Sequence, residues 1–310
     1  MRIAILGRTE MLLDSARALV SAGHEIGLVA TCRASGHELA QEDDFRTFAA
    51  AQGAPFLMGP RLDRPETLAI LTQARCDVGI SMNWLTLIPS VVRDAFTHGV
   101  FNAHPGDLPR FKGNACPNWA ILLGETQLVL AIHRMIDRLD AGPIALRRQL
   151  RLHDQARIGE VYEWLRTEIP AAYVEFIGRL EQGDVPLEEQ PSDPASSLRC
   201  YPRRPEDGRI DWSLSAAQLS RLVRASSRPF DGAFTTLEGA RRLTVWNAAA
   251  VAAPEPFVAT PGQIAYGDRG EPVVCCGEDY LRLTEIELEG CATDELAKAA
   301  VLSSLRNRLI

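Results

Sequence analysis

The densest group of polar side chains in this 310-residue sequence lies at residues 102–107, directly after a short apolar run. Asn102 and His104 are two residues apart, so their side chains face the same side if the strand continues. An amide that donates a hydrogen bond beside an imidazole suits carbonyl chemistry, because one group holds an oxyanion and the other moves a proton. The alternative is a polar strand end closed by Pro105 and Gly106, with no catalytic role.

A second polar group lies between two apolar stretches, residues 128–132 and 144–146. It begins at His133 and ends at Asp140, which is followed by Ala-Gly and therefore indicates a tight turn. On local grounds alone, a solvated turn aspartate is the leading alternative to a functional one.

Short apolar runs alternate with stretches of helical periodicity through the first part of the chain. The runs that predict strands are residues 2–6, 25–31, 78–81 and 100–103. The stretches that predict helices are residues 10–22, 45–52, 65–74 and 89–95. This alternation indicates βαβ units and a mostly parallel, Rossmann-like sheet. Ligands bind beyond the carboxyl ends of such strands, which is where Asn102 and His104 lie.

The second half of the chain has a different pattern. Residues 158–180 repeat apolar side chains at three- and four-residue steps and predict one long helix, kinked near Pro170. Residues 184–205 hold several prolines and few apolar side chains, which is typical of a linker. The short alternating stretches beyond it, with Gly and Pro between them, predict a small β-barrel of the OB type.

Charge and composition exclude several classes. The formal net charge of −7 argues against general nucleic-acid binding. The sequence has no apolar run of about 18 residues, and its N-terminal apolar stretch is too short for a secretion signal, so we expect a cytoplasmic protein without a membrane segment. The seven Cys are scattered, as in proteins with reduced thiols. The six His lack metal-site spacing, so we expect no metal, and the dinucleotide, P-loop and nucleophile-elbow motifs are absent.

Several segments share one family pattern. They are Phe101–Pro105, Leu108-Pro109, Gly113, Pro117–Ile121, Gly124–Thr126, His133–Met135, Asp140–Gly142, Arg203–Trp212 and Pro229–Phe234. Together they resemble the 10-formyltetrahydrofolate-dependent formyltransferase family, which includes methionyl-tRNA formyltransferases and enzymes that formylate amino sugars such as UDP-4-amino-4-deoxy-L-arabinose. The resemblance implies a Rossmann-like catalytic domain at residues 1–185, a linker at 186–202 and an OB-like domain at 203–310.

The resemblance also implies a mechanism and a donor. It assigns the family's catalytic set to Asn102, His104 and Asp140. Asn102 and a protonated His104 would stabilise the oxyanion that forms when an amine attacks the formyl group of 10-formyltetrahydrofolate, and Asp140 would orient His104. The family's folate pocket corresponds to two loops here, and the residues expected at it are Met82, Trp84, Leu85, Leu87, Ile136 and Asp137.

The acceptor that we expect is a small amine, such as an amino sugar with or without a nucleotide. The segment at residues 33–46, where the tRNA enzymes carry an insertion, is short and acidic here and would repel phosphate. Initiator tRNA is therefore the alternative acceptor and not the first choice. A formate-releasing hydrolase and a folate-binding module are two further alternatives, and a homodimer stays open. The residues proposed to contact the acceptor are Arg8, Asp107, Arg203 and Arg204.

Overall fold

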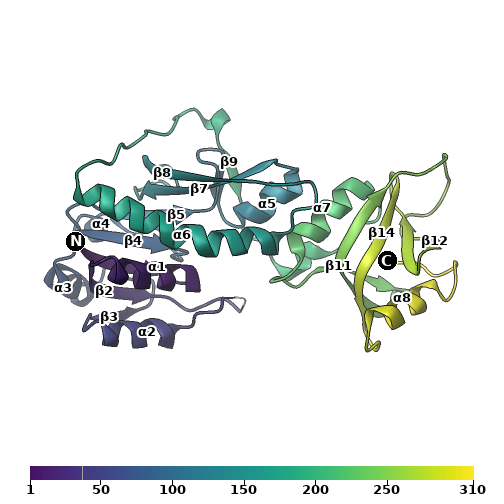
Figure 1. Cartoon of the computed structure of the whole chain (residues 1–310), viewed down its shortest axis with the longest axis horizontal. Coiled ribbons are helices and arrows are strands. Elements are labelled where there is room, and N and C mark those ends of the chain that lie inside the picture. The colour runs from purple at the N-terminus through teal and green to yellow at the C-terminus, as the bar shows by residue number, and fades with distance from the viewer. Residues whose placement is uncertain (37) are drawn as a thin grey trace. The chain divides into compact units, whose positions relative to one another are not determined.

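The chain folds into two compact units in a computed structural model that describes residues 1–36 and 38–310 (Figure 1). The first unit contains Met1–Cys116, Gln127–Arg151 and Tyr162–Tyr201. The second contains Pro117–Thr126, Leu152–Val161 and Pro202–Ile310. Each unit therefore collects segments that are distant in the sequence.

The first unit is built on a seven-stranded sheet in the order β3-β2-β1-β4-β5-β7-β8. Its strands are β1 (Arg2–Gly7), β2 (Glu25–Thr31), β3 (Phe56–Met58), β4 (Val78–Met82), β5 (Val100–His104), β7 (Gln127–Arg134) and β8 (Ile144–Arg151). The pairings from β3 to β5 are parallel, and β7 and β8 add two antiparallel strands. This confirms the prediction of a mixed α/β unit with a mostly parallel sheet. Its central strands are buried on both faces, as parallel strands covered by helices must be.

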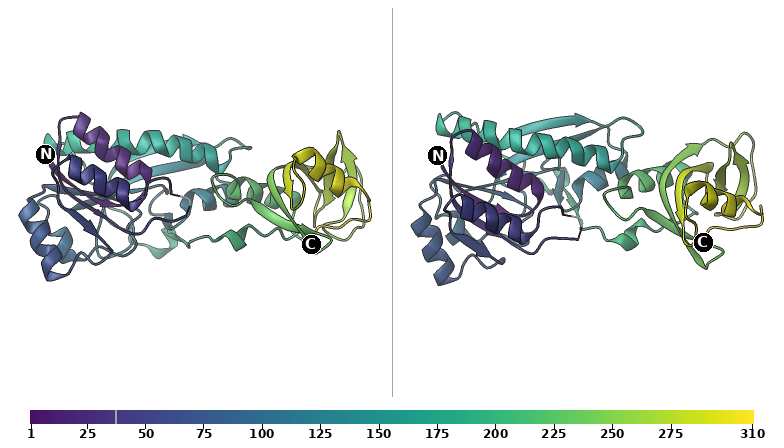
Figure 2. Two further views of the ribbon diagram at one scale, coloured as in Figure 1. Left: turned by 90° about the horizontal axis from the view of Figure 1, so that it is seen from below. Right: turned by 60° about the horizontal axis from the view of Figure 1, so that its bottom comes forward.

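Helices cover both faces of this sheet. They are α1 (Glu10–Ser21), α2 (Glu42–Ala51), α3 (Pro65–Ala74), α4 (Ser90–Arg93) and α6 (Ile158–Glu181). Figures 1 and 2 show α1 and α6 side by side, and Arg166 on α6 forms an ion pair with Glu10 on α1 at 3.3 Å. The helix α6 runs through Pro170 as one element, and its buried Tyr173 hydroxyl donates a hydrogen bond of 2.6 Å to the Ser81 carbonyl. That contact fixes the end of β4, where ligand-binding loops begin.

A small parallel ladder pairs β6 (Phe111–Gly113) with β9 (Leu198–Cys200). A 3-10 turn, η1 (Pro194–Ser196), precedes β9, and Glu188 exchanges backbone hydrogen bonds of 2.8 and 2.9 Å with Ile144. These pairings run along the segment for which the sequence predicts a linker. The predicted domain boundaries themselves stay a prediction.

The second unit has an antiparallel sheet in the order β10-β11-β14-β13-β12. Its elements are α5 (Cys116–Leu123, whose first residue belongs to the first unit), η2 (Pro205–Gly208), α7 (Ala216–Ser226), β10 (Ala233–Leu237), β11 (Arg241–Val251), β12 (Ile264–Asp268), β13 (Glu271–Cys275), β14 (Tyr280–Leu288) and α8 (Asp294–Leu302). Ser215 caps α7 by accepting from the Gln218 N–H, and Leu219 and Val223 on that helix are fully buried against the sheet.

The prediction of an OB-type barrel is only partly met. In the described part of the chain, no strand ladder joins β10 to β12, so a closed barrel is not confirmed. Residues 309 and 310 instead pair with β10 and with the segment before β12. Ile310 exchanges hydrogen bonds of 3.0 and 2.9 Å with Thr236 on β10, and the Leu309 N–H donates to the Gly262 carbonyl at 2.8 Å. Across residues 1–36 and 38–310, no helix is both long and apolar enough to cross a membrane.

Candidate active site

Polar residues that the sequence singles out lie on two neighbouring strands, β5 and β7. Asn102 and His104 lie at the end of β5, and His133 lies near the end of the adjacent strand β7. The antiparallel register pairs Asn102 directly with His133. His104 and His133 are 4% and 2% exposed, so both imidazoles lie inside the protein.

Asp140 reaches this point on the loop between β7 and β8. Its backbone has φ of 46°, a left-handed conformation that costs a non-glycine residue energy. The Gly113 N–H donates to Asp140 Oδ2 at 2.8 Å, and the Gln190 side-chain amide donates to the carbonyls of Asp140 and Gly142 at 3.0 and 2.7 Å. A Cβ on Gly142 would lie 1.9 Å from the Arg134 carbonyl, so this tight turn requires glycine there.

The structure brings the three residues of the expected catalytic set together. His104 Nδ1 lies 3.7 Å from Asp140 Oδ2, and His133 Nε2 lies 3.5 Å from Asp140 Oδ1. Asn102 Nδ2 lies 3.4 Å from His133 Nε2. One buried carboxylate thus stands between two imidazoles, and the amide adjoins the second imidazole.

Backbone carbonyls determine which nitrogen of each imidazole carries a proton. His104 Nε2 lies 2.6 Å from the Phe111 carbonyl, which only accepts hydrogen bonds, so Nε2 is protonated and Nδ1 faces Asp140. His133 Nδ1 lies 3.1 Å from the Arg134 carbonyl and is protonated for the same reason. His133 Nε2 is then free to accept a hydrogen bond from the Asn102 amide.

Burial sets the charges of this group. It lowers the pKa of His104 below its ordinary value, and the opposing attraction of Asp140 does not reverse that. Burial by itself would raise the pKa of Asp140, but His104, His133 and the Gly113 N–H favour the carboxylate and hold that pKa well below its usual range. A neutral His104 therefore stands beside an ionised Asp140 at neutral pH, whereas the sequence interpretation expected a protonated imidazole.

The expected folate residues lie on two loops that follow β4 and β7. Met82 is buried at the end of β4, and its carbonyl accepts the Arg8 N–H at 3.1 Å. Trp84 packs on the same core as Met135, whereas Leu85 and Leu87 are 51% and 47% exposed.

The second loop is tied down by a buried arginine. Arg93 donates to the Met135 carbonyl at 2.9 Å and forms an ion pair with Asp137. The Asp137 carboxylate is thereby paired with Arg93, although its side chain is 82% exposed. The neighbouring Ile136 side chain packs within 3.2 Å of the position that a Gly142 Cβ would take.

The residues expected at the acceptor belong to both units, and two of them, Arg8 and Asp107, lie in the first. Arg8 donates to the carbonyls of Asn83 and Arg33 at 3.0 and 2.8 Å, and its Nε lies 3.4 Å from the buried Glu38 carboxylate. Asp107 follows β5 and is half-buried.

The other two residues of that set belong to the second unit. The Arg203 guanidinium donates to the Asp207 carbonyl at 2.9 Å and to the Ser226 hydroxyl at 3.2 Å, both in the same unit. Burial lowers the pKa of this guanidinium. Arg204 is exposed, and its backbone N–H donates to Asp207 Oδ2 at 2.7 Å.

Some residues at the centre were not assigned to it from the sequence. His133 carried a visible signal, since it belongs to the second polar group, but it was not placed in the catalytic set. Gln190 has no such signal in the sequence, because it lies in the proline-rich segment that predicts a linker. Cys116 is the third: its thiol lies 3.7 Å from His104 Nε2 and donates to the Phe111 carbonyl at 3.4 Å.

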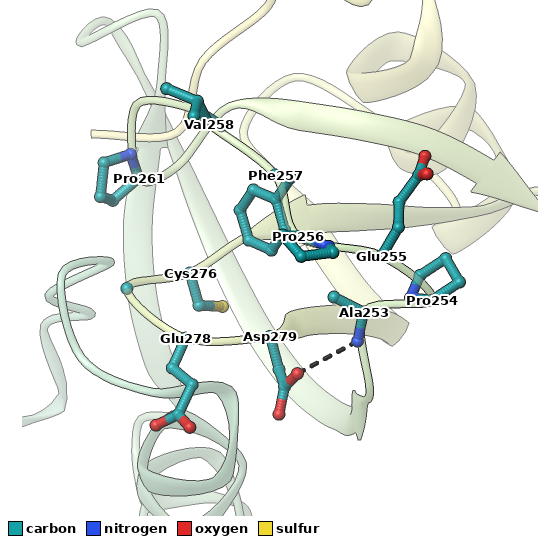
Figure 3. A pocket seen from close by; sticks show the side chains of 12 residues that line it. Ala253, Pro254, Glu255, Pro256, Phe257, Val258, Pro261, Cys276, Glu278 and Asp279 are labelled. Carbon is teal, nitrogen blue, oxygen red and sulfur yellow. Dashed lines mark hydrogen bonds between the residues drawn. The ribbon is translucent and has the colours of Figure 1, made fainter.

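A pocket of about 660 Å³ lies within the second unit (Figure 3). Its lining includes Phe257 and the carboxylates of Glu255, Glu278 and Asp279, and it holds none of the site residues expected from the sequence. Within the described residues, no group of three or more His, Cys, Asp or Glu side chains is arranged to hold a metal ion.

Comparison with known proteins defines the class. Residues 1–177 match the family described as "Formyl transferase", and residues 203–299 match "Formyl transferase, C-terminal domain". The chain belongs to the formyl transferase family and is a formyl-transferring enzyme.

Individual relatives fall into two groups. The chain is 32% identical to a methionyl-tRNA formyltransferase of Chloroflexus aggregans, over 93% of this chain and 92% of that one. Among solved structures, it resembles a Helicobacter canadensis N-formyltransferase in complex with folinic acid and dTDP-3-aminofucose (TM-score 0.62, 11% identity, 92% and 99% of the two chains). It also resembles HypX from Aquifex aeolicus in complex with tetrahydrofolic acid (TM-score 0.59, 18% identity, 94% and 45%). At these identities, the two solved structures show a shared fold.

Proposed function

We propose that this enzyme transfers a formyl group from 10-formyltetrahydrofolate to the primary amine of a small acceptor, most simply an amino sugar. The observation that carries the proposal is the single buried cluster of Asn102, His104 and Asp140 at the ends of adjacent strands, in a chain of the formyl transferase family. The folates in the related solved structures support the donor.

The residues of the two loops suit a flat, partly apolar group such as a pterin. The Trp84 indole N–H is buried without a hydrogen-bond partner in the described residues, so it is a donor that awaits an acceptor. Leu85 and Leu87 expose apolar side chains on the same loop. When bound there, 10-formyltetrahydrofolate would supply the formyl carbon, and tetrahydrofolate would be the leaving group.

The side chains at the centre divide the work. Asn102 offers an N–H to the oxygen that gains negative charge as the amine attacks, and a well-placed donor of this kind is worth about 3 kcal/mol. His104 Nδ1, unprotonated at rest, takes the proton that the amine loses. The ionised Asp140 then stabilises the imidazolium, and the proton leaves with the departing nitrogen of the donor.

Charge supports a small acceptor over tRNA. The first turn of α2 is acidic, with Glu42, Asp43 and Asp44. The residues that line the pocket of the second unit include Glu255, Glu278 and Asp279 and no Lys or Arg (Figure 3). Both surfaces repel phosphate. Methionyl-tRNA is nevertheless a second candidate, because the curated relative from Chloroflexus aggregans is named for that acceptor.

One assay separates these possibilities. The protein is mixed with 10-formyltetrahydrofolate, and tetrahydrofolate release is followed with amino-sugar nucleotides, with methionyl-tRNA and with no acceptor. Release that requires the small amine supports the proposal, and release that requires the tRNA favours the second candidate. Release without any amine would mean a hydrolase, and no release in any arm would leave a folate-binding module.

A further inference from the structure

The β6–β9 ladder carries positive charge to the edge of the catalytic centre. Its parallel register pairs Lys112 with Arg199. The Arg199 guanidinium crosses the ladder, since its Nε lies 3.1 Å from the position that a Gly113 Cβ would take. Two cationic side chains thus start from paired positions of one short ladder.

The same ladder is attached to the loop of Asp140. The hydrogen bond of 2.8 Å from the Gly113 N–H to Asp140 Oδ2 places Lys112, the preceding residue, beside that loop. Arg138 lies on the loop two residues before Asp140 and is exposed. Partial burial lowers the pKa of the Lys112 ammonium, the positive charge of Arg138 lowers it further, and the attraction of Asp140 opposes both.

These cations lack the carboxylate partners that nearby cations have. Arg147 is paired with Glu188, and Arg93 with Asp137. Among the described residues, no carboxylate oxygen lies within 4.0 Å of the charged groups of Lys112, Arg138 or Arg199.

The Asp140 carboxylate, which acts on Lys112, is also engaged. Asp140 lies between the two histidines and accepts the Gly113 N–H. Arg199 lies over the Tyr201 ring at 5.7 Å, a contact that leaves its net charge in place. Like charges without carboxylate partners next to a reaction centre favour a bound anion.

We propose that Lys112, Arg138 and Arg199 form a subsite for an anionic group, a phosphate or a carboxylate, of a substrate bound at the His104–Asp140 centre. The inference rests on the proposed function for the identity of that centre. Two substrates can supply the anion. One is an acceptor that carries a phosphate or diphosphate, and the other is the donor, through the carboxylates of its glutamate tail.

The test measures binding in the full-length protein and needs no turnover. Inorganic pyrophosphate is titrated into the wild type and the variants Lys112→Gln and Arg138→Gln by calorimetry. We expect each substitution to weaken pyrophosphate binding about 10-fold, because each removes a charge-assisted contact. Lys112→Arg keeps the charge and should bind within about 3-fold of the wild type. Arg61→Gln, which removes an exposed arginine paired with Asp63, is the matched control and should leave the affinity unchanged.

A second titration identifies the source of the anion. Each variant is titrated with 5-formyltetrahydrofolate and with 5-formyltetrahydropteroate, which lacks the glutamate. Unchanged affinity for both, with weakened pyrophosphate binding, assigns the subsite to the acceptor. If the variants bind 5-formyltetrahydrofolate more weakly but bind 5-formyltetrahydropteroate as the wild type does, the subsite belongs to the glutamate tail.

The subsite is overturned if the wild type does not bind pyrophosphate at about 10 mM, or if all variants bind it equally. Because binding is measured directly, this failure is distinct from a failure of formyl transfer in the release assay.

Discussion

Two histidines with different bonding share the single carboxylate of Asp140 at the centre. His104 has its Nε2 proton held by a carbonyl and its Nδ1 directed to Asp140, which suits a proton acceptor. His133 has its Nδ1 proton held and presents Nε2 to Asn102 and Asp140. The second histidine therefore accepts from the Asn102 amide and fixes its orientation.

We expect His133→Ala to lower kcat about 10-fold or more while KM for the donor changes little, because Asn102 loses the acceptor that orients its amide. His133→Gln, which retains hydrogen-bonding atoms, should recover part of that loss. Steady-state kinetics of both variants, with the exposed His153→Ala as the control, checks this. An unchanged kcat in His133→Ala would rule out the positioning role.

The lowered pKa of His104 makes stability depend on pH in a defined direction. The unfolded chain takes up a proton near the ordinary histidine value of about 6.5, while folded His104 resists it. The free energy of unfolding should therefore fall as pH drops below about 6.5, by up to about 1.4 kcal/mol per pH unit for this one group. Asp140 titrates below its ordinary value of 3.8, outside this window.

Urea unfolding of the wild type and His104→Gln at pH 7.5 and 5.5 tests that sign. The wild type should lose roughly 1 kcal/mol more than the variant between the two pH values. Equal losses would show that the folded protein does not suppress protonation of His104.

At this scale, the convergence of Asn102, His104 and Asp140 was predictable, because the residue types and the family pattern are visible in the sequence. The protonation state of His104 was not. It depends on complete burial and on the Phe111 carbonyl, and a backbone oxygen leaves no trace in residue types.

The turn after β5 supports the imidazole at the scale of elements. A Cβ on Gly106 would lie 2.4 Å from the Phe111 carbonyl and 2.5 Å from His104 Nε2. The absence of a side chain there lets the chain fold back so that the carbonyl can accept from the ring. Gly106 is therefore required by packing around His104, since a methyl group would occupy the space of that hydrogen bond.

We expect Gly106→Ala to lower kcat at least about 10-fold and the free energy of unfolding by about 1–3 kcal/mol. Gly178→Ala on α6 is the matched control, because a Cβ there meets nothing within 4 Å. It should stabilise the protein by about 0.5–1 kcal/mol, as alanine does in a helix. Kinetics and urea unfolding of both variants check this, and wild-type kcat in Gly106→Ala would contradict the packing argument.

The alternation of strands and helices was enough to predict the mixed α/β sheet, because burial on both faces and helical periodicity are local signals. The pairing of β9 with β6 and the reach of Gln190 to Asp140 were not predictable. A proline-rich composition indicates only the local conformation of a segment. It could not predict these contacts, because they are made with residues far away in the sequence.

At the scale of the whole molecule, the second unit gathers three separate stretches of chain. Within it, the buried Asn118 on α5 donates to the Ala225 carbonyl at 2.8 Å, and Arg224 on α7 donates to the Ala156 carbonyl at 2.8 Å. Side chains from one stretch thus satisfy backbone groups of another. Such long-range bonding could not be predicted from a pattern of local periodicity.

We expect Asn118→Ala to lower the free energy of unfolding by about 1–3 kcal/mol, because it leaves the Ala225 carbonyl buried without its donor. The exposed Asn114→Ala is the control and should change stability by less than about 0.5 kcal/mol. Urea unfolding measures both, and equal stabilities of the two variants would contradict the role of this bond.

The turnover of three single variants tests the central claim most directly. Asn102→Ala, His104→Ala and Asp140→Ala are each assayed for amine-dependent release of tetrahydrofolate, once circular dichroism shows that they fold. Because each removes a group that acts on the reacting atoms, kcat should fall about 100-fold or more in every case. Near-wild-type turnover in all three variants would contradict the account.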